Sequence, residues 1–165
     1  MDFYKQISKL KQLERNGWKK FKIDGRLESV AEHTMSAILL AIYEIKHQKI
    51  DLDELKVIKM LAFHDLAESE VGDITPYDNI SKQDKFNREY AFIKKFSKEI
   101  NMPEIETLWL EFEQGKTPEA QFVYNIDKFD AVEQARIYSC QTKNSEIADE
   151  FDSRYKHIVN QFKKS

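Results

Sequence analysis

Residues 59–73 read KMLAFHDLAESEVGD, and this stretch decides how the rest of the chain is interpreted. Its first half is apolar and is typical of a helix that packs into a core. His64, Asp65 and Glu68 nevertheless lie within it. Because an unpaired carboxylate or imidazolium is costly to bury, such groups are normally paired or bound to a metal. The stretch therefore predicts a buried helix that also carries chemistry.

Two further apolar segments contain ionisable residues in the same way. VAEHTMSAILLAI at 30–42 contains His33, and FVYNIDKFDAVEQA at 122–135 contains Asp127 and Asp130. Three such intrusions in one short chain indicate that the polar side chains meet in the folded protein. Asp130 lies about one helical turn after Asp127. It either supports the polar cluster from behind or lies on a solvated face.

Helical periodicity continues through most of the chain. The 165 residues include only 4 glycines and 3 prolines, whereas average usage of the two is roughly 12%, and this disfavours an all-β fold with its frequent turns. Ser29 and Glu32 form a capping box before an apolar helix. The sequence predicts a single all-α domain over residues 1–165, a bundle of six to seven helices with a loop at 15–29. The expected helices cover about 2–14, 30–47, 52–69, 81–100, 103–114, 118–142 and 145–163.

The composition limits the classes of function. The sequence contains neither GxGxxG nor GxxxxGKS/T, so a glycine-rich phosphate loop is excluded. A single cysteine excludes a disulfide framework or thiolate zinc cluster, and no apolar stretch reaches the roughly 18 residues of a membrane span. Nucleic-acid binders are usually basic, whereas this chain has 26 basic and 29 acidic residues, and its basic run KKFK at 19–22 is short. The charged N-terminus lacks signal-peptide character, which favours the cytoplasm. We expect neither a membrane nor a nucleic-acid partner.

The spacing of the polar residues suits a metal site. His64 and Glu68 are four positions apart and Asp65 and Glu68 are three apart, so all three border one side of a helix end. His64 and Asp65 diverge by about 100° around the helix axis, and the imidazole is long enough to curve back toward a shared ion. His33 and Asp127 would come from neighbouring helices. Two imidazoles and two carboxylates suit Mn, Fe, Co or Zn rather than Ca. Four protein ligands on a six-coordinate ion leave two positions for water and substrate.

The flanking residues connect this pattern to a family. The order His33, His64-Asp65, Asp127 on a helical background resembles the HD-domain superfamily of metal-dependent phosphohydrolases. Four surrounding motifs resemble the branch of bacterial 5′-deoxynucleotidases and their small eukaryotic relatives: ERNGWKKF, RLESVAEHTMSA, AFHDLAESEVGDITP and YNIDKFDAVEQA. The resemblance implies an HD-type helical bundle, often a homodimer. It also implies removal of the 5′-phosphate from (deoxy)ribonucleoside monophosphates with one divalent ion, which is Co, Mn, Mg, Fe or Zn.

Carried over by position, the resemblance assigns roles to individual residues. Glu68 matches the acid that follows the HD pair, and Asp73 matches the acid of the Gly-Asp step, and both are expected to be catalytic. Glu68 would orient the attacking water or accept its proton. Asp73 would donate to the leaving oxygen or bind the sugar hydroxyl. The matching metal ligands are His33, His64, Asp65 and Asp127.

The early segment ERNGWKKF is expected to face the nucleotide. The resemblance implies substrate binding by Arg15 and Trp18, although Asn16-Gly17 separates two residues that are adjacent in some relatives. Arg15 is suited to pair with phosphate through its planar guanidinium, and Lys128 is either a second cation there or a surface lysine. Trp18 either stacks on the sugar or base or plugs the core.

Other interpretations of the same pattern stay open. Another HD hydrolase, such as a phosphodiesterase or a pyrophosphohydrolase of guanosine nucleotides, would share the same four ligands. A non-catalytic helical scaffold could instead keep a metal for stability. Buried histidines often have purely structural roles, and His47 and His157, near polar or charged helix ends, are predicted to lie on the surface.

Overall fold

The fold is built from helices, as the sequence predicts. The computed structural model describes residues 2–75 and 77–162, and within them the only β-structure is an isolated bridge between Glu14 and Ser29. The helical elements are α1 (Phe3–Gln12), the 3₁₀ helix η1 (Asn16–Phe21), α2 (Val30–Gln48), α3 (Glu54–His64), α4 (Glu68–Val71), α5 (Lys82–Glu99), α6 (Pro103–Gln114), α7 (Pro118–Thr142), α8 (Ser145–Arg154) and α9 (Lys156–Phe162). Residue 163, at the end of the final predicted helix, lies outside the described part.

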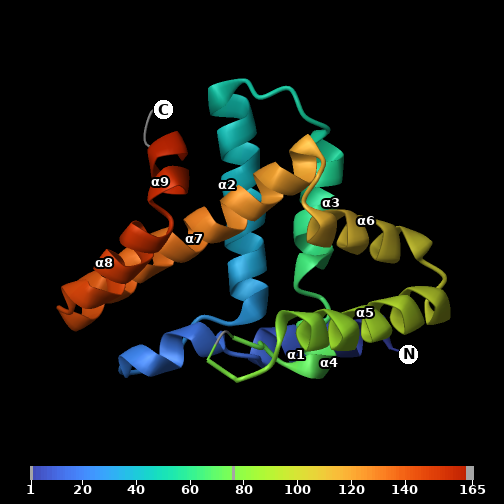
Figure 1. Ribbon diagram of the computed structural model, residues 1–165, viewed down its shortest axis with the longest axis horizontal. Coiled ribbons are helices and arrows are strands. Elements are labelled where there is room, and N and C mark those ends of the chain that lie inside the picture. Colours follow the sequence, from blue (N-terminus) through green and yellow to red (C-terminus); the bar gives the residue numbers. More distant parts are fainter. Residues whose placement is uncertain (1, 76, 163–165) are drawn as a thin grey trace.

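Helix α2 forms the centre of the arrangement. Figure 1 shows α2 in mid-view with α7 crossing it and α3 at its side, while α5 and α6 form a pair on one flank. Helix α2 contacts α1, α3 and α7, and α3 also contacts α7. The three groups of ionisable residues that interrupt apolar segments lie on α2, at the end of α3 and on α7. The packing of these helices therefore brings distant polar residues together.

Local capping sets the start of α2. The Ser29 hydroxyl accepts a hydrogen bond from the Glu32 backbone N–H at 3.2 Å, and the Glu32 carboxylate accepts from the Ser29 N–H at 2.8 Å. This reciprocal box satisfies two N–H groups that a helix start otherwise leaves without partners. It confirms the predicted boundary and fixes His33 in the first turn of the helix.

The predicted helix over 52–69 is divided, which corrects the expected count. Asp65 leaves helical geometry at φ −100° and ψ 11°, and the N–H groups of Leu66 and Glu68 bond three residues back. The His64 carbonyl, released from the helix, accepts a hydrogen bond from the indole N–H of Trp109 at 3.1 Å. This contact with α6 allows the chain to turn immediately after His64.

A second division separates α8 from α9. Tyr155 adopts φ −113° and ψ 26°, so the predicted helix over 145–163 bends there. After the bend, Ile158 and Phe162 pack with the core between α2, α3 and α7, while Val159 packs near Trp18. Because of the two divisions, residues 2–75 and 77–162 contain nine α-helices rather than six or seven.

The stretch 15–29, predicted to be a loop, contains η1. Trp18 is only 2% exposed, and its ring stacks on Phe151 with a centroid separation of 4.9 Å. The ends of the stretch are joined by backbone hydrogen bonds, from Arg15 to Glu28 and from Val30 to Leu13. Burial of the indole therefore explains why this segment is ordered against α7 and α8 instead of being a free loop.

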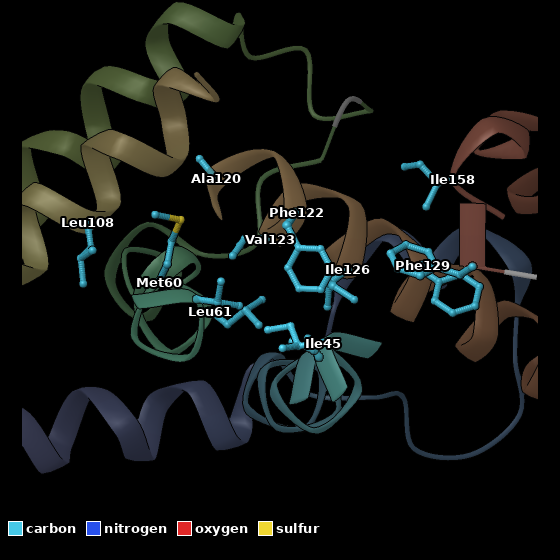
Figure 2. Close-up of a cluster of buried hydrophobic side chains, with 14 residues drawn as sticks. Ile45, Met60, Leu61, Leu108, Ala120, Phe122, Val123, Ile126, Phe129 and Ile158 are labelled. Atoms are coloured by element: carbon cyan, nitrogen blue, oxygen red, sulfur yellow. The ribbon is translucent and has the colours of Figure 1, made fainter. Parts of the chain in front are cut away.

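The largest described apolar cluster fills the space between α2, α3 and α7. Figure 2 shows Ile45 of α2, Leu61 of α3 and Ile126 of α7 converging on one region. Leu61 and Ile126 have no exposed surface. Fully burying an aliphatic side chain contributes about 1.5–3 kcal/mol, so this contact fixes the relative positions of the three helices. Among the described residues, no helix combines the length and apolar character needed to cross a membrane.

Candidate active site

The four predicted metal ligands meet where α2, α3 and α7 converge. Nε2 of His33 lies 3.2 Å from Oδ1 of Asp127 and 3.8 Å from Oδ2 of Asp65. Nε2 of His64 lies 3.1 Å from the same Asp65 oxygen. Ligand atoms of His33, His64 and Asp65 all fall within 4.8 Å of one another. Helix packing therefore collects two imidazoles and two carboxylates around one point.

The donor atoms at this point suit a divalent cation. His33 is 0% and His64 is 4% exposed, yet neither Nε2 has a hydrogen-bond partner within residues 2–75 and 77–162. A buried polar atom without a partner normally costs free energy. Imidazole nitrogens beside carboxylate oxygens form a donor set that binds Mn, Fe, Co or Zn. The residues present therefore fit the metal that the sequence pattern predicts.

Hydrogen bonds behind the histidines set their orientation. Nδ1 of His64 lies 2.7 Å from the Leu61 carbonyl, and because a carbonyl only accepts, this nitrogen carries the proton. Nδ1 of His33 lies 2.7 Å from Oδ2 of Asp130, whose other oxygen accepts from the Ser36 hydroxyl at 2.5 Å. Both rings therefore direct Nε2 toward the carboxylates. Asp130, which the sequence left open, lies behind His33 and not on a solvated face.

The charges around the site favour a cation. Burial and nearby Arg15 oppose protonation of His33, but Asp127 and Asp130 outweigh them and raise its pKa to about 9. Burial also opposes ionisation of Asp127, yet Lys128 and His33 hold the pKa of that carboxyl well below its usual range. Nζ of Lys128 lies 2.7 Å from Oδ2 of Asp127. The Asp127 carboxylate is thus ionised, and its surroundings favour positive charge.

A cavity of about 290 Å³ opens beside these residues. Asp65 and Asp127 line it, as do the two predicted catalytic acids, Glu68 and Asp73. Glu68 is buried, and burial together with Asp65 and Asp73 raises its pKa well above the usual value. The Asp73 carboxylate accepts a hydrogen bond from the backbone N–H of Asn16 at 2.6 Å. The loop after α4 is therefore tied to η1 at the edge of the cavity.

Arg15 and Trp18 also line this cavity, but in different ways. Nη1 of Arg15 is buried and has no hydrogen-bond partner among the described residues. Burial would lower its pKa, but Asp127 and Asp65 raise it, so the guanidinium stays charged. The Trp18 indole N–H donates to Glu28 at 3.2 Å, and the ring is packed into the core. Trp18 therefore lies at the cavity wall as a buried plug.

Sequence reasoning missed several residues of this site. Ser36 and Lys85 were not expected there, and Lys128 was left open between cation and surface lysine. Ser36 lies three positions after His33, a spacing that places two side chains on one helix face, so its role was detectable. Lys85 lines the cavity from α5, and nothing in its local sequence indicates this.

The buried histidine and aspartate cluster, carried by helices alone, defines the class of an HD-domain protein. A family model described as "HD domain" matches residues 7–165, and the chain belongs to this family.

Several curated proteins are similar to the chain. The "5′-deoxynucleotidase HDDC2" of Dictyostelium discoideum is 36% identical over 149 residues, covering 86% of this chain and 78% of that protein. The "5′-deoxynucleotidase hdd1" of Schizosaccharomyces pombe is 34% identical, covering 80% and 68%. The human "5′-deoxynucleotidase HDDC2" is 32% identical, covering 93% and 75%.

Two solved structures share the fold. The PH0347 protein from Pyrococcus horikoshii OT3 has a TM-score of 0.77 and 28% identity, covering 93% of this chain and 86% of that chain. A conserved hypothetical protein from Pyrococcus furiosus has a TM-score of 0.75 and 27% identity, covering 97% and 96%.

Proposed function

We propose that this chain is a metal-dependent 5′-nucleotidase that hydrolyses (deoxy)ribonucleoside 5′-monophosphates to nucleoside and phosphate. One observation carries the proposal: the unpartnered Nε2 atoms of His33 and His64 lie beside two carboxylates, at a cavity that the Arg15 guanidinium also lines. The relatives named 5′-deoxynucleotidases support the choice of substrate.

The metal site comprises His33, His64, Asp65 and Asp127. A divalent ion bound there would neutralise phosphoryl charge and lower the pKa of its bound water. The hydrogen bonds from Nδ1 of each imidazole keep Nε2 available for this ion. Co, Mn, Mg, Fe and Zn are the candidate ions.

Arg15 binds the phosphate of the substrate. Its buried Nη1 has a free N–H in the described structure, and a guanidinium makes paired, charge-assisted hydrogen bonds to phosphate oxygens. Lys128 is fixed on Asp127 and adds positive charge to the same cavity. The Trp18 backbone N–H donates to the Arg15 carbonyl at 3.3 Å, and the Trp18 side chain lines the same cavity.

Glu68 and Asp73 handle protons. Glu68 orients the attacking water and accepts its proton, because it lies at the start of α4 in the cavity wall beside Asp65. Asp73 either donates a proton to the leaving 5′ oxygen or accepts a hydrogen bond from the sugar hydroxyl, through the carboxyl oxygen that Asn16 does not occupy. Positioning and charge stabilisation of this kind account for most catalysis of phosphoryl transfer.

The chain acts as one HD domain over residues 1–165, and as a homodimer. Met35, Leu39 and Tyr43 on α2 are 59%, 60% and 52% exposed. Their spacing of four residues places them in one row on the helix. Packing against the same row of a second copy of the chain would bury these apolar side chains. The cytoplasmic location and the absence of nucleic-acid or membrane partners stay predictions from the sequence.

A substrate panel tests the function. Phosphate release would be measured from ribo- and deoxyribonucleoside 5′-monophosphates with Co, Mn, Mg, Fe and Zn, beside a cyclic nucleotide and a guanosine pyrophosphate. We expect turnover of the monophosphates only. Preferential turnover of the cyclic or pyrophosphate substrate would favour the other HD hydrolases. Metal binding without any turnover would favour a scaffold role.

A further inference from the structure

A cluster of charged and aromatic side chains lines part of the cavity, and its members contact one another. Nζ of Lys20 lies 2.7 Å from the Tyr77 hydroxyl and 2.5 Å from the Glu150 carboxylate. The Arg154 guanidinium lies 2.6 Å from Glu150 and 3.3 Å from the same hydroxyl. These residues come from η1, the loop after α4, and α8. Three segments far apart in sequence are thus joined at one place.

The cluster holds its donors in fixed positions. Lys20 Nζ lies 4.7 Å from the Tyr77 ring centroid and 4.5 Å from that of Phe21. Lys20, Tyr77 and Arg154 line the cavity, whereas Glu150 contacts both cations from behind. Nζ of Lys20 contacts three acceptors, the Tyr77 hydroxyl and both Glu150 oxygens. Arg154 uses Nη2 for its contacts with Tyr77 and Glu150, and a guanidinium carries further N–H donors for a ligand in the cavity.

The cavity therefore has two polar regions with different contacts. In the first region, Asp65 and Asp127 contact the two imidazoles and Lys128. In the second, Lys20 and Arg154 contact Tyr77 and Glu150. A nucleoside monophosphate also has two ends, an anionic phosphate and a flat base that carries hydrogen-bond acceptors. With the phosphate bound in the first region, the base of the same nucleotide lies against the second region of the same cavity.

We propose that Lys20, Tyr77 and Arg154 bind the base of the nucleotide, with Glu150 as their positioning residue. This proposal rests on the proposed nucleotidase function. Every base presents ring-nitrogen or carbonyl acceptors to the guanidinium donors of Arg154, while Lys20 places positive charge beside the Tyr77 ring. Every base also has a π-face that stacks on an aromatic ring with little sequence preference. The cluster therefore recognises features common to the four bases, and the enzyme accepts all four.

A substrate without a base separates this role from phosphate binding. Hydrolysis of dAMP, dGMP, dCMP and dTMP would be compared with that of 2-deoxyribose 5-phosphate for the wild type, Tyr77→Ala and Lys20→Met. For all four nucleotides we expect KM to rise at least tenfold with kcat within twofold. For 2-deoxyribose 5-phosphate we expect kcat/KM to stay within twofold. Lys59→Met is the matched control, because Lys59 makes a 2.6 Å ion pair with Glu104 away from this cavity.

Equal losses on the nucleotides and on 2-deoxyribose 5-phosphate would overturn the proposal, because the cluster would then act on phosphate or on loop structure alone. Unchanged KM values for nucleotides would overturn it too. If Tyr77→Ala unfolds, as judged by circular dichroism, Tyr77→Phe removes only the hydroxyl and should raise the nucleotide KM alone. If the wild type hydrolyses none of the substrates, the nucleotidase function fails instead. Calorimetry with deoxyadenosine then decides, because the base site predicts binding that Tyr77→Ala weakens at least tenfold.

Discussion

Nδ1 of His33 lies 2.7 Å from Oδ2 of Asp130, and both side chains are buried. This contact directs the opposite nitrogen of the ring, Nε2, toward Asp127 and Asp65. The Ser36 hydroxyl bonds to the second oxygen of Asp130, so the carboxylate is itself held in place. A carboxylate that receives the far N–H of a histidine fixes the tautomer and raises the basicity of the ligand.

Asp130→Asn should therefore weaken metal binding while the four proposed metal ligands stay intact. Loss of such a partner typically costs about 10–100-fold in metal affinity, and we expect a decrease of that size in a calorimetric titration with Mn or Co. Asp149→Asn, at an exposed position on α8, is the control. An Mn affinity of Asp130→Asn within twofold of the wild type would show that His33 is oriented without its partner.

Arg15→Met should reduce affinity for phosphate. A hydrogen bond to a charged group contributes about 1.5–3 kcal/mol, so the inhibition constant for inorganic phosphate should rise at least tenfold. The kcat/KM for nucleotides should fall by a similar factor. Arg88→Met, at an exposed position on α5, should leave both values unchanged. Normal phosphate inhibition in Arg15→Met would remove Arg15 from the phosphate site.

Trp18→Ala should destabilise the protein strongly. The indole is buried against Phe151 and Tyr138, and truncating such a residue to alanine typically costs about 3–5 kcal/mol. Urea unfolding followed by circular dichroism measures the effect. Tyr4→Ala, at a side chain that is 66% exposed, should change stability by less than about 0.5 kcal/mol. A loss below about 1 kcal/mol for Trp18→Ala would contradict its role as a core plug.

The stability of the fold should fall between mildly acidic and neutral pH because of Glu89. Burial raises the pKa of Glu89 to about 7, with Lys85 opposing, so the folded state binds this proton more tightly than the unfolded state. The stabilisation is full below the unfolded pKa, near 4.3, and is lost as pH rises through 7, with a slope up to about 1.4 kcal/mol per pH unit.

Glu89→Gln tests this pH dependence. The variant should be more stable than the wild type at pH 8, and this advantage should shrink at pH 5, as measured by urea unfolding at both values. The exposed substitution Glu146→Gln should show no such difference between the two pH values. A Glu89→Gln effect of equal size at pH 5 and pH 8 would contradict the raised pKa.

The features that depend on residues close together in the chain were predicted from the sequence. Ser29 and Glu32 predict the start of α2. His33, His64 and Asp127 interrupt the apolar periodicity of their segments, which indicates a polar cluster between helices. The break at Asp65 was missed because it depends on Trp109, 44 positions further along the chain and in contact with the His64 carbonyl. Such a contact exists only after α3 and α6 have packed.

The cluster of Lys20, Tyr77, Glu150 and Arg154 could not be predicted from the sequence for a similar reason. Lys20 belongs to the basic run 19–22, which resembles a solvated segment in sequence. Its carboxylate partner, Glu150, is separated from it by 130 positions. The stacking of Trp18 on Phe151 brings η1 and α8 together, and no local sequence pattern identifies Phe151 as the partner of Trp18.

We propose that His33, His64, Asp65 and Asp127 hold a metal that the hydrolysis of nucleotides requires. Asp65→Asn tests it most directly, with circular dichroism to verify folding and with phosphate release from deoxynucleoside monophosphates measured in Mn or Co. Because one carboxylate ligand is lost, we expect weaker metal binding by calorimetry and a fall in activity on the order of 100-fold or more. His47→Ala, at an exposed histidine on α2, should retain wild-type activity. Full activity and normal metal affinity in a folded Asp65→Asn protein would contradict the claim.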